Sequence, residues 1–194
     1  MENLKNIKEA IFVIDMNNGF CEKGNLADPS IKHIVPNIRE NIRKTLKNKG
    51  ALFFVNDKHA SKSVELTRYA SHCATEEEQK TIKELAIFEP YATKIFYKNS
   101  TCALFAPGVM ETILKMENIQ TIRITGCCTD ICIMNFAVAL RNFLDETNLN
   151  INIEVPINAV ETFHIPGVHD RIEANNFGYR VMEQNGIRLV KELK

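Results

Sequence analysis

Short runs of consecutive apolar residues, separated by stretches of helical periodicity, are the feature that most restricts the fold of this chain. Residues 10–14 (AIFVI) and 51–55 (ALFFV) contain no polar side chain. A strand that is apolar at every position is buried on both faces, as in parallel sheets with helices above and below them. Four further strands are predicted, at 94–97, 121–125, 151–155 and 187–190.

The stretches between these strands have the pattern of amphipathic helices. Ile38, Ile42 and Leu46 recur every four residues on one helical face. Further helices are predicted at 75–85, after Pro107, at 130–144 and at about 169–185. We therefore predict an α/β fold: a three-layer α/β/α, Rossmann-like domain with a mainly parallel six-stranded sheet. No linker or repeat divides the chain, so residues 1–194 are expected to form a single domain.

The charge balance argues against large polyanionic partners. The chain has 24 basic and 24 acidic residues, so it offers no basic field for nucleic acid or an anionic membrane. No apolar run is long enough to span a membrane, and the first residues do not resemble a signal peptide. We expect a cytoplasmic homo-oligomer whose six cysteines are reduced and whose partner is a small molecule.

Four features suited to chemistry follow directly after predicted strands: Asp15, Asp57, Lys98 and the turn from Gly126 to Cys132. In α/β folds, sites form at the carboxyl ends of the strands. Cys132 also begins a helix, whose dipole would lower the thiol pKa and whose free N–H groups could stabilise an oxyanion. The alternative is that a buried cysteine is only a small hydrophobic residue.

Asp15 and Lys98 could complete a catalytic group with that thiol. A carboxylate beside a thiol can accept its proton and later pass it to a leaving amine. A lysine between them would hold thiolate and carboxylate in one network of charges. Taken separately, Asp15 could instead be a turn residue and Lys98 a surface residue.

The polar loop at 57–75 contains a set of side chains suited to a metal. Asp57 and His59 are two residues apart and point to the same side of an extended chain. Glu65 and His72 follow in the same loop, and two imidazoles with carboxylates suit zinc, iron or manganese. The alternative is a set of solvated loop residues. His164 and His169 lack such partners, and we interpret them as surface or capping residues.

Three segments together resemble the isochorismatase-like cysteine hydrolases over essentially the whole chain. Residues 11–20 (IFVIDMNNGF) look like the opening strand of that family, and residues 125–133 (TGCCTDICI) resemble its nucleophile motif T-G-x-x-T-D-x-C-V. Residues 97–100 (YKNS) stand where its lysine stands. The resemblance implies that Asp15 is the general base, Lys98 the catalytic lysine and Cys132 the nucleophile.

The resemblance also implies the surroundings of the thiol. Backbone N–H groups of Cys128 and Cys132 would hold the oxyanion, and the peptide bond between Cys127 and Cys128 would be cis. Phe20 and Cys127 are assigned to substrate binding, although position alone would make Cys127 and Cys128 packing residues.

Within that family, the loop resembles the metal site of nicotinamidases. Asp57, His59 and His72 match its ligands, and Glu65 matches a further ligand seen in some members. The expected cofactor is one divalent transition metal, zinc in the first place, with iron or manganese as alternatives. Other branches of the family generally lack this metal.

The resemblance implies a cysteine-dependent amidohydrolase that cleaves a small carboxamide through a thioester intermediate. Nicotinamide, giving nicotinate and ammonia, is the best guess. The chain departs from the family at Asn17, where glutamine is common, at Lys58, where an aromatic residue is usual, and in segments 69–72 and 100–105. These changes affect the pocket walls, so the alternatives are a metal-independent hydrolase of another amide or ureide, and a catalytically silent binding protein.

Overall fold

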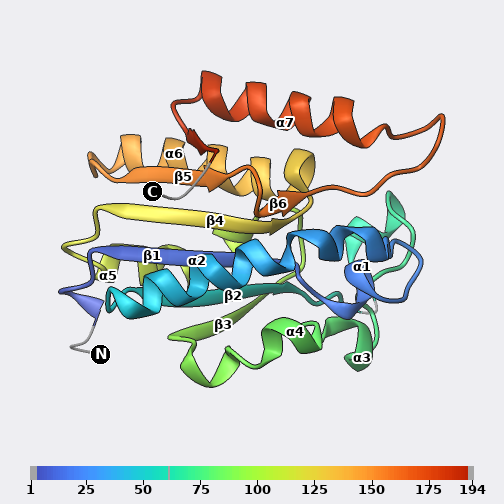
Figure 1. Ribbon diagram of the computed structural model, residues 1–194, viewed down its shortest axis with the longest axis horizontal. Helices are drawn as coiled ribbons and strands as arrows, with labels where there is room; N and C mark the ends of the chain where they lie inside the picture. Colours follow the sequence, from blue (N-terminus) through green and yellow to red (C-terminus); the bar gives the residue numbers. More distant parts are fainter. Residues whose placement is uncertain (1–3, 61, 192–194) are drawn as a thin grey trace.

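Seven strands form one sheet in the computed structural model, which describes residues 4–60 and 62–191. The strands are β1 (Glu9–Ile14), β2 (Ala51–Asp57), β3 (Lys94–Lys98), β4 (Thr121–Cys127), β5 (Asn152–Pro156), β6 (Val160–Glu161) and β7 (Arg188–Val190). The sheet order is β3-β2-β1-β4-β5-β7, β6 pairs with β4, and every pairing is parallel. The predicted α/β fold with a parallel sheet is confirmed (Figure 1).

Helices cover both faces of this sheet. They are α1 (Asn18–Cys21), α2 (Val35–Lys47), α3 (Glu76–Gln79), α4 (Lys83–Ala86), α5 (Val109–Lys115), α6 (Met134–Glu146) and α7 (Arg171–Gln184). Short 3-10 turns occur at η2 (Pro29–Ile34), η3 (Val64–Thr67), η4 (Glu89–Tyr91) and η5 (Ala103–Phe105), and a π-helical turn at η6 (Thr129–Ile133). The face with α2 lies toward the viewer in Figure 1.

The apolar strands separate two buried cores. In β1, Phe12 and Ile14 pack with the side chains of α5 and α6, whereas Ile11 and Val13 pack with those of α2. Successive strand residues point to opposite faces, so a strand with a core on each side needs apolar residues at every position. This is the physical reason for the uninterrupted runs in the sequence.

Three details differ from the sequence prediction. Strand β6 has only two residues, too short to leave a periodic pattern, and adds a seventh strand to the predicted six. The predicted helix at 75–85 is split in two, since the N–H of Ile82 bonds the carbonyl of Met16 instead of continuing a helix. The predicted helix at 130–144 begins with the π turn η6 before regular α6 starts.

Gly126 brings β4 and β1 unusually close at the end that carries the site. A Cβ atom at this glycine would lie 2.0 Å from the carbonyl oxygen of Ile14, and its φ of +115° is one that other residues rarely adopt. The next residue after β1, Asp15, has a positive φ of 52°. The close approach therefore places Asp15 beside the turn that follows β4.

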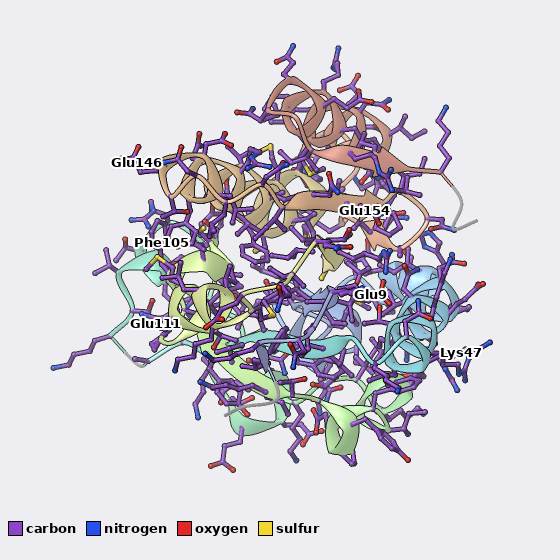
Figure 2. All side chains as sticks on the ribbon, turned by 90° about the vertical axis from the view of Figure 1, so that its left-hand side faces the viewer. Glu9, Lys47, Phe105, Glu111, Glu146 and Glu154 are labelled. Carbon is purple, nitrogen blue, oxygen red and sulfur yellow. The ribbon has the colours of Figure 1, made fainter. Side chains whose placement is uncertain are left out.

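The opposite end of the sheet carries a structural ion network. There Arg123 of β4 lies 2.8 Å from Glu154 and 3.8 Å from Glu9, all near the amino ends of their strands. Figure 2 looks onto this end, with Glu9 and Glu154 labelled between the ends of α2 and α6. No described helix combines the length and apolar character needed to cross a bilayer.

Candidate active site

The three residues predicted as a triad meet around one buried ammonium group. Lys98 Nζ lies 2.8 Å from Asp15 Oδ2 and 3.6 Å from Cys132 Sγ. A third contact, 2.7 Å to Asp57 Oδ1, joins this group to the loop after β2. All four side chains are buried. Burying a lysine is costly without partners, and here all three donors of the ammonium face an acceptor.

The electrostatics of this group make Asp15 a suitable base. Burial raises the pKa of Asp15 to about 7, against the opposing charge of Lys98 and with a contribution from Asp57. The charge of Asp15 acts on the thiol of Cys132, so the two groups lie close together. A general base works best when its pKa lies near the working pH, which the position of Asp15 provides.

The pKa of Cys132 differs from the sequence prediction. Burial raises it well above the ordinary thiol value, and the charges of Asp15 and Asp57 add to this effect although Lys98 opposes it. The expected lowering by a helix start is wrong because the dipole effect of a first turn is small beside the removal of the thiol from water. The resting group is therefore a thiol beside a carboxylate.

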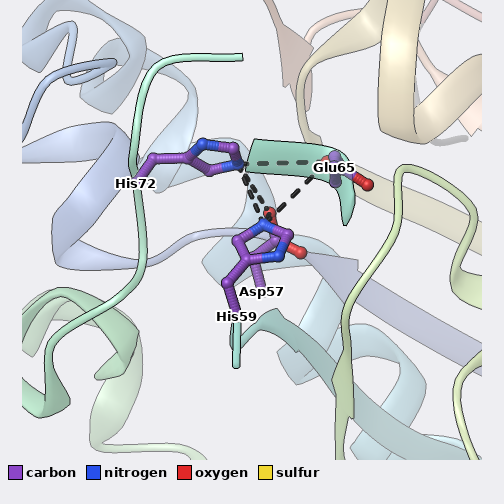
Figure 3. A group of neighbouring side chains, drawn as sticks. All are labelled: Asp57, His59, Glu65 and His72. Carbon is purple, nitrogen blue, oxygen red and sulfur yellow. Dashed lines mark hydrogen bonds and ion pairs between the residues drawn. The ribbon is translucent and has the colours of Figure 1, made fainter. Parts of the chain in front are cut away.

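The four predicted metal ligands converge on one point, as Figure 3 shows. Asp57 Oδ2 lies 3.1 Å from His59 Nε2 and 3.3 Å from His72 Nε2, and the two ring nitrogens are 3.0 Å apart. Glu65 Oε1 lies 3.9 and 4.0 Å from them. All four residues are buried, and one ligand atom from each lies within 4.8 Å of the others.

The hydrogen bonds of the two rings show that this point suits a cation. His72 Nδ1 contacts the carbonyl of Ala70 at 2.7 Å, and His59 Nδ1 contacts Asn99 Oδ1 at 3.0 Å. Both partners are acceptors, because Asn99 Oδ1 also receives the N–H of Ala60, so both Nδ1 atoms carry hydrogen. Both Nε2 atoms then face the carboxylates, where each can donate a proton or, without that proton, offer a lone pair to a cation.

Proton and metal would compete for this point. Burial opposes a charge on His59, but the hydrogen bond and charge of Asp57 raise its pKa. The charge of Lys98 and bonds from both histidines hold the pKa of Asp57 well below its usual range in spite of burial. A carboxylate that stays ionised beside two imidazole lone pairs is a donor set for a divalent transition metal.

A cavity of about 230 Å³ opens onto both groups. Its lining comprises Asp15, Phe20, Asn25, Leu26, Ala27, Asp28, Asp57, Glu65, Tyr69, His72, Thr101, Cys128, Ile131, Cys132, Phe163, His164 and Ile165. The volume lies below the roughly 300–1,000 Å³ of pockets for drug-sized ligands. The cavity therefore suits a small substrate placed between the thiol and the metal ligands.

Of the residues assigned to substrate contact and to the oxyanion, all but Cys127 line the cavity. Phe20 lines the cavity, whereas Cys127 does not: it is fully buried behind the wall, where its thiol donates to the carbonyl of Asp15 at 3.1 Å. The peptide bond between Cys127 and Cys128 is cis, as the resemblance implied. The N–H of Cys128 has no acceptor within residues 4–60 and 62–191.

The sequence reasoning missed one wall of the cavity. Phe163, His164 and Ile165 follow β6 in a loop without a recognisable motif. His169, which we expected to be a surface or capping residue, is half-buried, and its Nε2 lies 2.9 Å from Asp130 Oδ2. His164 does act as a cap, since its Nδ1 accepts the N–H of Arg171 at the start of α7.

Comparison with known proteins agrees with this geometry. The isochorismatase domain matches residues 9–166, and no curated protein matches significantly. Among solved structures, nicotinamidase from Bacillus subtilis is 23% identical, with a TM-score of 0.76 over 95% of this chain and 100% of that one. N-carbamoylsarcosine amidase from Thermoplasma acidophilum is 23% identical, with 0.73 over 97% and 99%. A zinc complex of pyrazinamidase from Pyrococcus horikoshii is 21% identical, with 0.74 over 95% and 99%.

The parallel α/β/α fold holds a buried cysteine, lysine and aspartate together at the carboxyl ends of its strands. The chain belongs to the isochorismatase family. The predicted enzyme class, a hydrolase acting on amides, is confirmed. At these identities the solved structures establish the fold, and the substrate is a separate question.

Proposed function

We propose that this protein hydrolyses nicotinamide to nicotinate and ammonia. The observation that carries the proposal is the position of Lys98, whose ammonium contacts both the carboxylate and thiol of the triad and the metal ligand Asp57. The reacting thiol and the donor set thus face one small cavity. An amide held at one end by the metal would present its carbonyl carbon to Cys132 at the other.

The residues of the triad supply the proton transfers. Asp15 takes the Sγ proton as Cys132 attacks the carbonyl carbon, and the N–H groups of Cys128 and Cys132 receive the developing oxyanion. Asp15 then gives its proton to the departing nitrogen. The nitrogen leaves as ammonia, and the acyl group stays on Cys132 as a thioester. Water, deprotonated by Asp15, releases the carboxylic acid and restores the thiol. Lys98 stays charged and holds both anionic groups in place.

The lining of the cavity favours an uncharged ring over an acidic ureide. Phe20, Tyr69, Phe163 and Ile131 provide aromatic and aliphatic surface, and no lysine or arginine belongs to the described lining. A substrate carboxylate would face Asp15, Asp57 and Glu65 without a cationic side chain at the wall. Nicotinamide has a flat neutral ring, which suits stacking against aromatic side chains.

Asp57, His59, Glu65 and His72 would hold one divalent transition metal, in the first place zinc. When bound, such a metal offers an electrophilic point at which a ring nitrogen could coordinate. Because the nucleophile is a thiol, the ligands need only orient the substrate. We further propose a single-domain, cytoplasmic homo-oligomer, as the composition and resemblance suggest.

Ammonia release from nicotinamide tests the proposed function. We expect purified protein to release ammonia and nicotinate in equal amounts, measured by a coupled ammonia assay and by chromatography. N-carbamoylsarcosine, which carries a carboxylate, should be hydrolysed far more slowly, because the described cavity lining has no lysine or arginine to pair with that carboxylate and has Asp15 and Asp28 instead. Turnover of the acidic ureide but not of nicotinamide would contradict the proposal.

Removing the metal should mainly weaken substrate binding. We expect elemental analysis to find about one zinc, iron or manganese per chain, lost in His72→Ala because one of four ligands is gone. The KM for nicotinamide should rise roughly 10- to 100-fold in this variant, while benzamide, which lacks the ring nitrogen, should be affected less. His33→Ala, an exposed histidine, is the matched control. Metal-free protein with an unchanged KM would refute the metal's role.

A further inference from the structure

We infer that His169 is a positioning residue that sets the distance between the nucleophile turn and the cavity wall formed by Phe163, His164 and Ile165. This inference rests on the proposed function, in which that wall contacts the substrate ring. The matched isochorismatase domain ends at residue 166, before His169. His169 and its contacts therefore lie outside the segment that matches the family.

His169 contacts the wall at three points. Its Nδ1 lies 3.0 Å from the carbonyl oxygen of Phe163, and its ring stacks on the Phe163 ring with centroids 3.9 Å apart and planes at 12°. Its backbone N–H and carbonyl both pair with Ile165, at 2.9 and 3.0 Å. Phe163 thus contacts the side chain of His169, and Ile165 hydrogen-bonds the backbone of His169.

The other side of the ring reaches the nucleophile turn. His169 Nε2 lies 2.9 Å from Oδ2 of Asp130, a residue of the π turn two positions before Cys132. Asp130 is held from behind by α7, since a Cβ at Gly178 would lie 3.1 Å from the Asp130 Cα. The backbone of Asp130 therefore packs closely against α7.

Both ring nitrogens of His169 face acceptor oxygens. Nδ1 faces the carbonyl oxygen of Phe163, and Nε2 faces a carboxylate oxygen of Asp130. A hydrogen on either nitrogen therefore has an acceptor within hydrogen-bond distance, so the ring can link the wall to the nucleophile turn.

A second fastening holds the same wall to the opposite rim. Asp28 Oδ2 accepts the N–H of His164 at 3.0 Å and a guanidinium N–H of Arg171 at 2.6 Å. Asp28 itself lines the cavity. This contact ties the wall to the rim segment 25–28, whereas the His169 contact ties the wall to the turn that carries Cys132.

Breaking the link should change ring recognition more than chemistry. When Phe163 is free to move away from Cys132, the triad keeps its contacts through Lys98, but the aromatic wall no longer holds the ring. The KM for an aromatic amide should therefore rise, while kcat stays nearly constant. A small aliphatic amide that does not reach the wall should show no such change.

Two variants separate the two hydrogen bonds. In His169→Asn the amide nitrogen can replace Nδ1 toward Phe163, and in His169→Gln it can replace Nε2 toward Asp130, so each variant keeps one half of the link. We expect each to raise the KM for nicotinamide up to about tenfold, the effect of losing one hydrogen bond, with kcat within about twofold. The control is His33→Asn, because His33 also contacts a carbonyl, at Ser30, and a carboxylate, at Glu161, but lies outside the cavity.

Amide hydrogen exchange of residues 163–168 gives a readout that needs no activity. Faster exchange in both His169 variants but not in His33→Asn, together with the raised KM, supports the inference. Unchanged exchange and KM would overturn it, and so would a fall in kcat at constant KM, which would assign His169 to the nucleophile instead of the wall. If the wild-type protein does not hydrolyse nicotinamide, the proposed function fails, and exchange alone then decides whether His169 positions the wall.

Discussion

Cys132→Ala is expected to lower nicotinamide hydrolysis by at least about 10,000-fold, because no other side chain can form the thioester. Cys132 lines the cavity, and its Sγ lies 3.6 Å from Lys98 Nζ. The alanine variant should keep its fold, since Cys132 packs in an apolar core and the change removes one sulfur atom. The measurement is ammonia release, with circular dichroism to confirm folding.

Cys127→Ala is the matched control for this variant. Cys127 is as buried as Cys132 and contacts the backbone of Asp15, but it does not line the cavity. We expect it to keep most of the activity. Iodoacetamide should inactivate the protein by alkylating Cys132, which peptide mass spectrometry can locate. Inactivation with the label mainly at another cysteine would disprove the assignment of the nucleophile.

Asp15→Asn is expected to lower kcat/KM by about 100- to 10,000-fold, the usual cost of losing a general base. The amide cannot accept the Sγ proton, and burial together with Asp57 keeps the pKa of Cys132 too high for spontaneous ionisation. The measurement is kcat/KM across pH. Asp145→Asn is the control, since Asp145 is an exposed aspartate that pairs with Arg141 on α6.

The pH profile gives this prediction a second test. Burial raises the pKa of Asp15 to about 7. The carboxylate is needed to accept the proton, so activity of the wild-type protein should fall as the pH drops through about 7. This acidic limb should be absent from the residual activity of Asp15→Asn. A variant that keeps near-normal rates and the same limb would show that another group is the base.

The sequence by itself determined the sheet and the edge on which the site lies. Runs such as 10–14 are apolar at every position only because a core lies on each face, and this requires a parallel sheet between helices. Once the sheet is parallel, the strand ends meet at one edge, so Asp15, Asp57 and Lys98 could be grouped without coordinates. The sequence did not predict strand β6, because two residues are too few to show a periodic pattern.

The tertiary structure alone decided the protonation chemistry and the pocket. The helix start of Cys132 is visible in the sequence, but its raised pKa depends on burial and on two carboxylates distant in the chain. Likewise, the loop residues 57–72 suggest a metal, yet only the orientation of both imidazoles shows that their Nε2 atoms converge.

The wall beside the nucleophile shows the same limit most clearly. Nothing in the local sequence distinguishes His169 from a surface histidine, and its role arises from Asp130, which is 39 residues away. Local patterns determine which backbone forms, because periodicity and propensity act over a few residues. Contacts between side chains from different loops depend on where the whole chain places them, and those contacts decide the charge state of each group and the shape of the cavity.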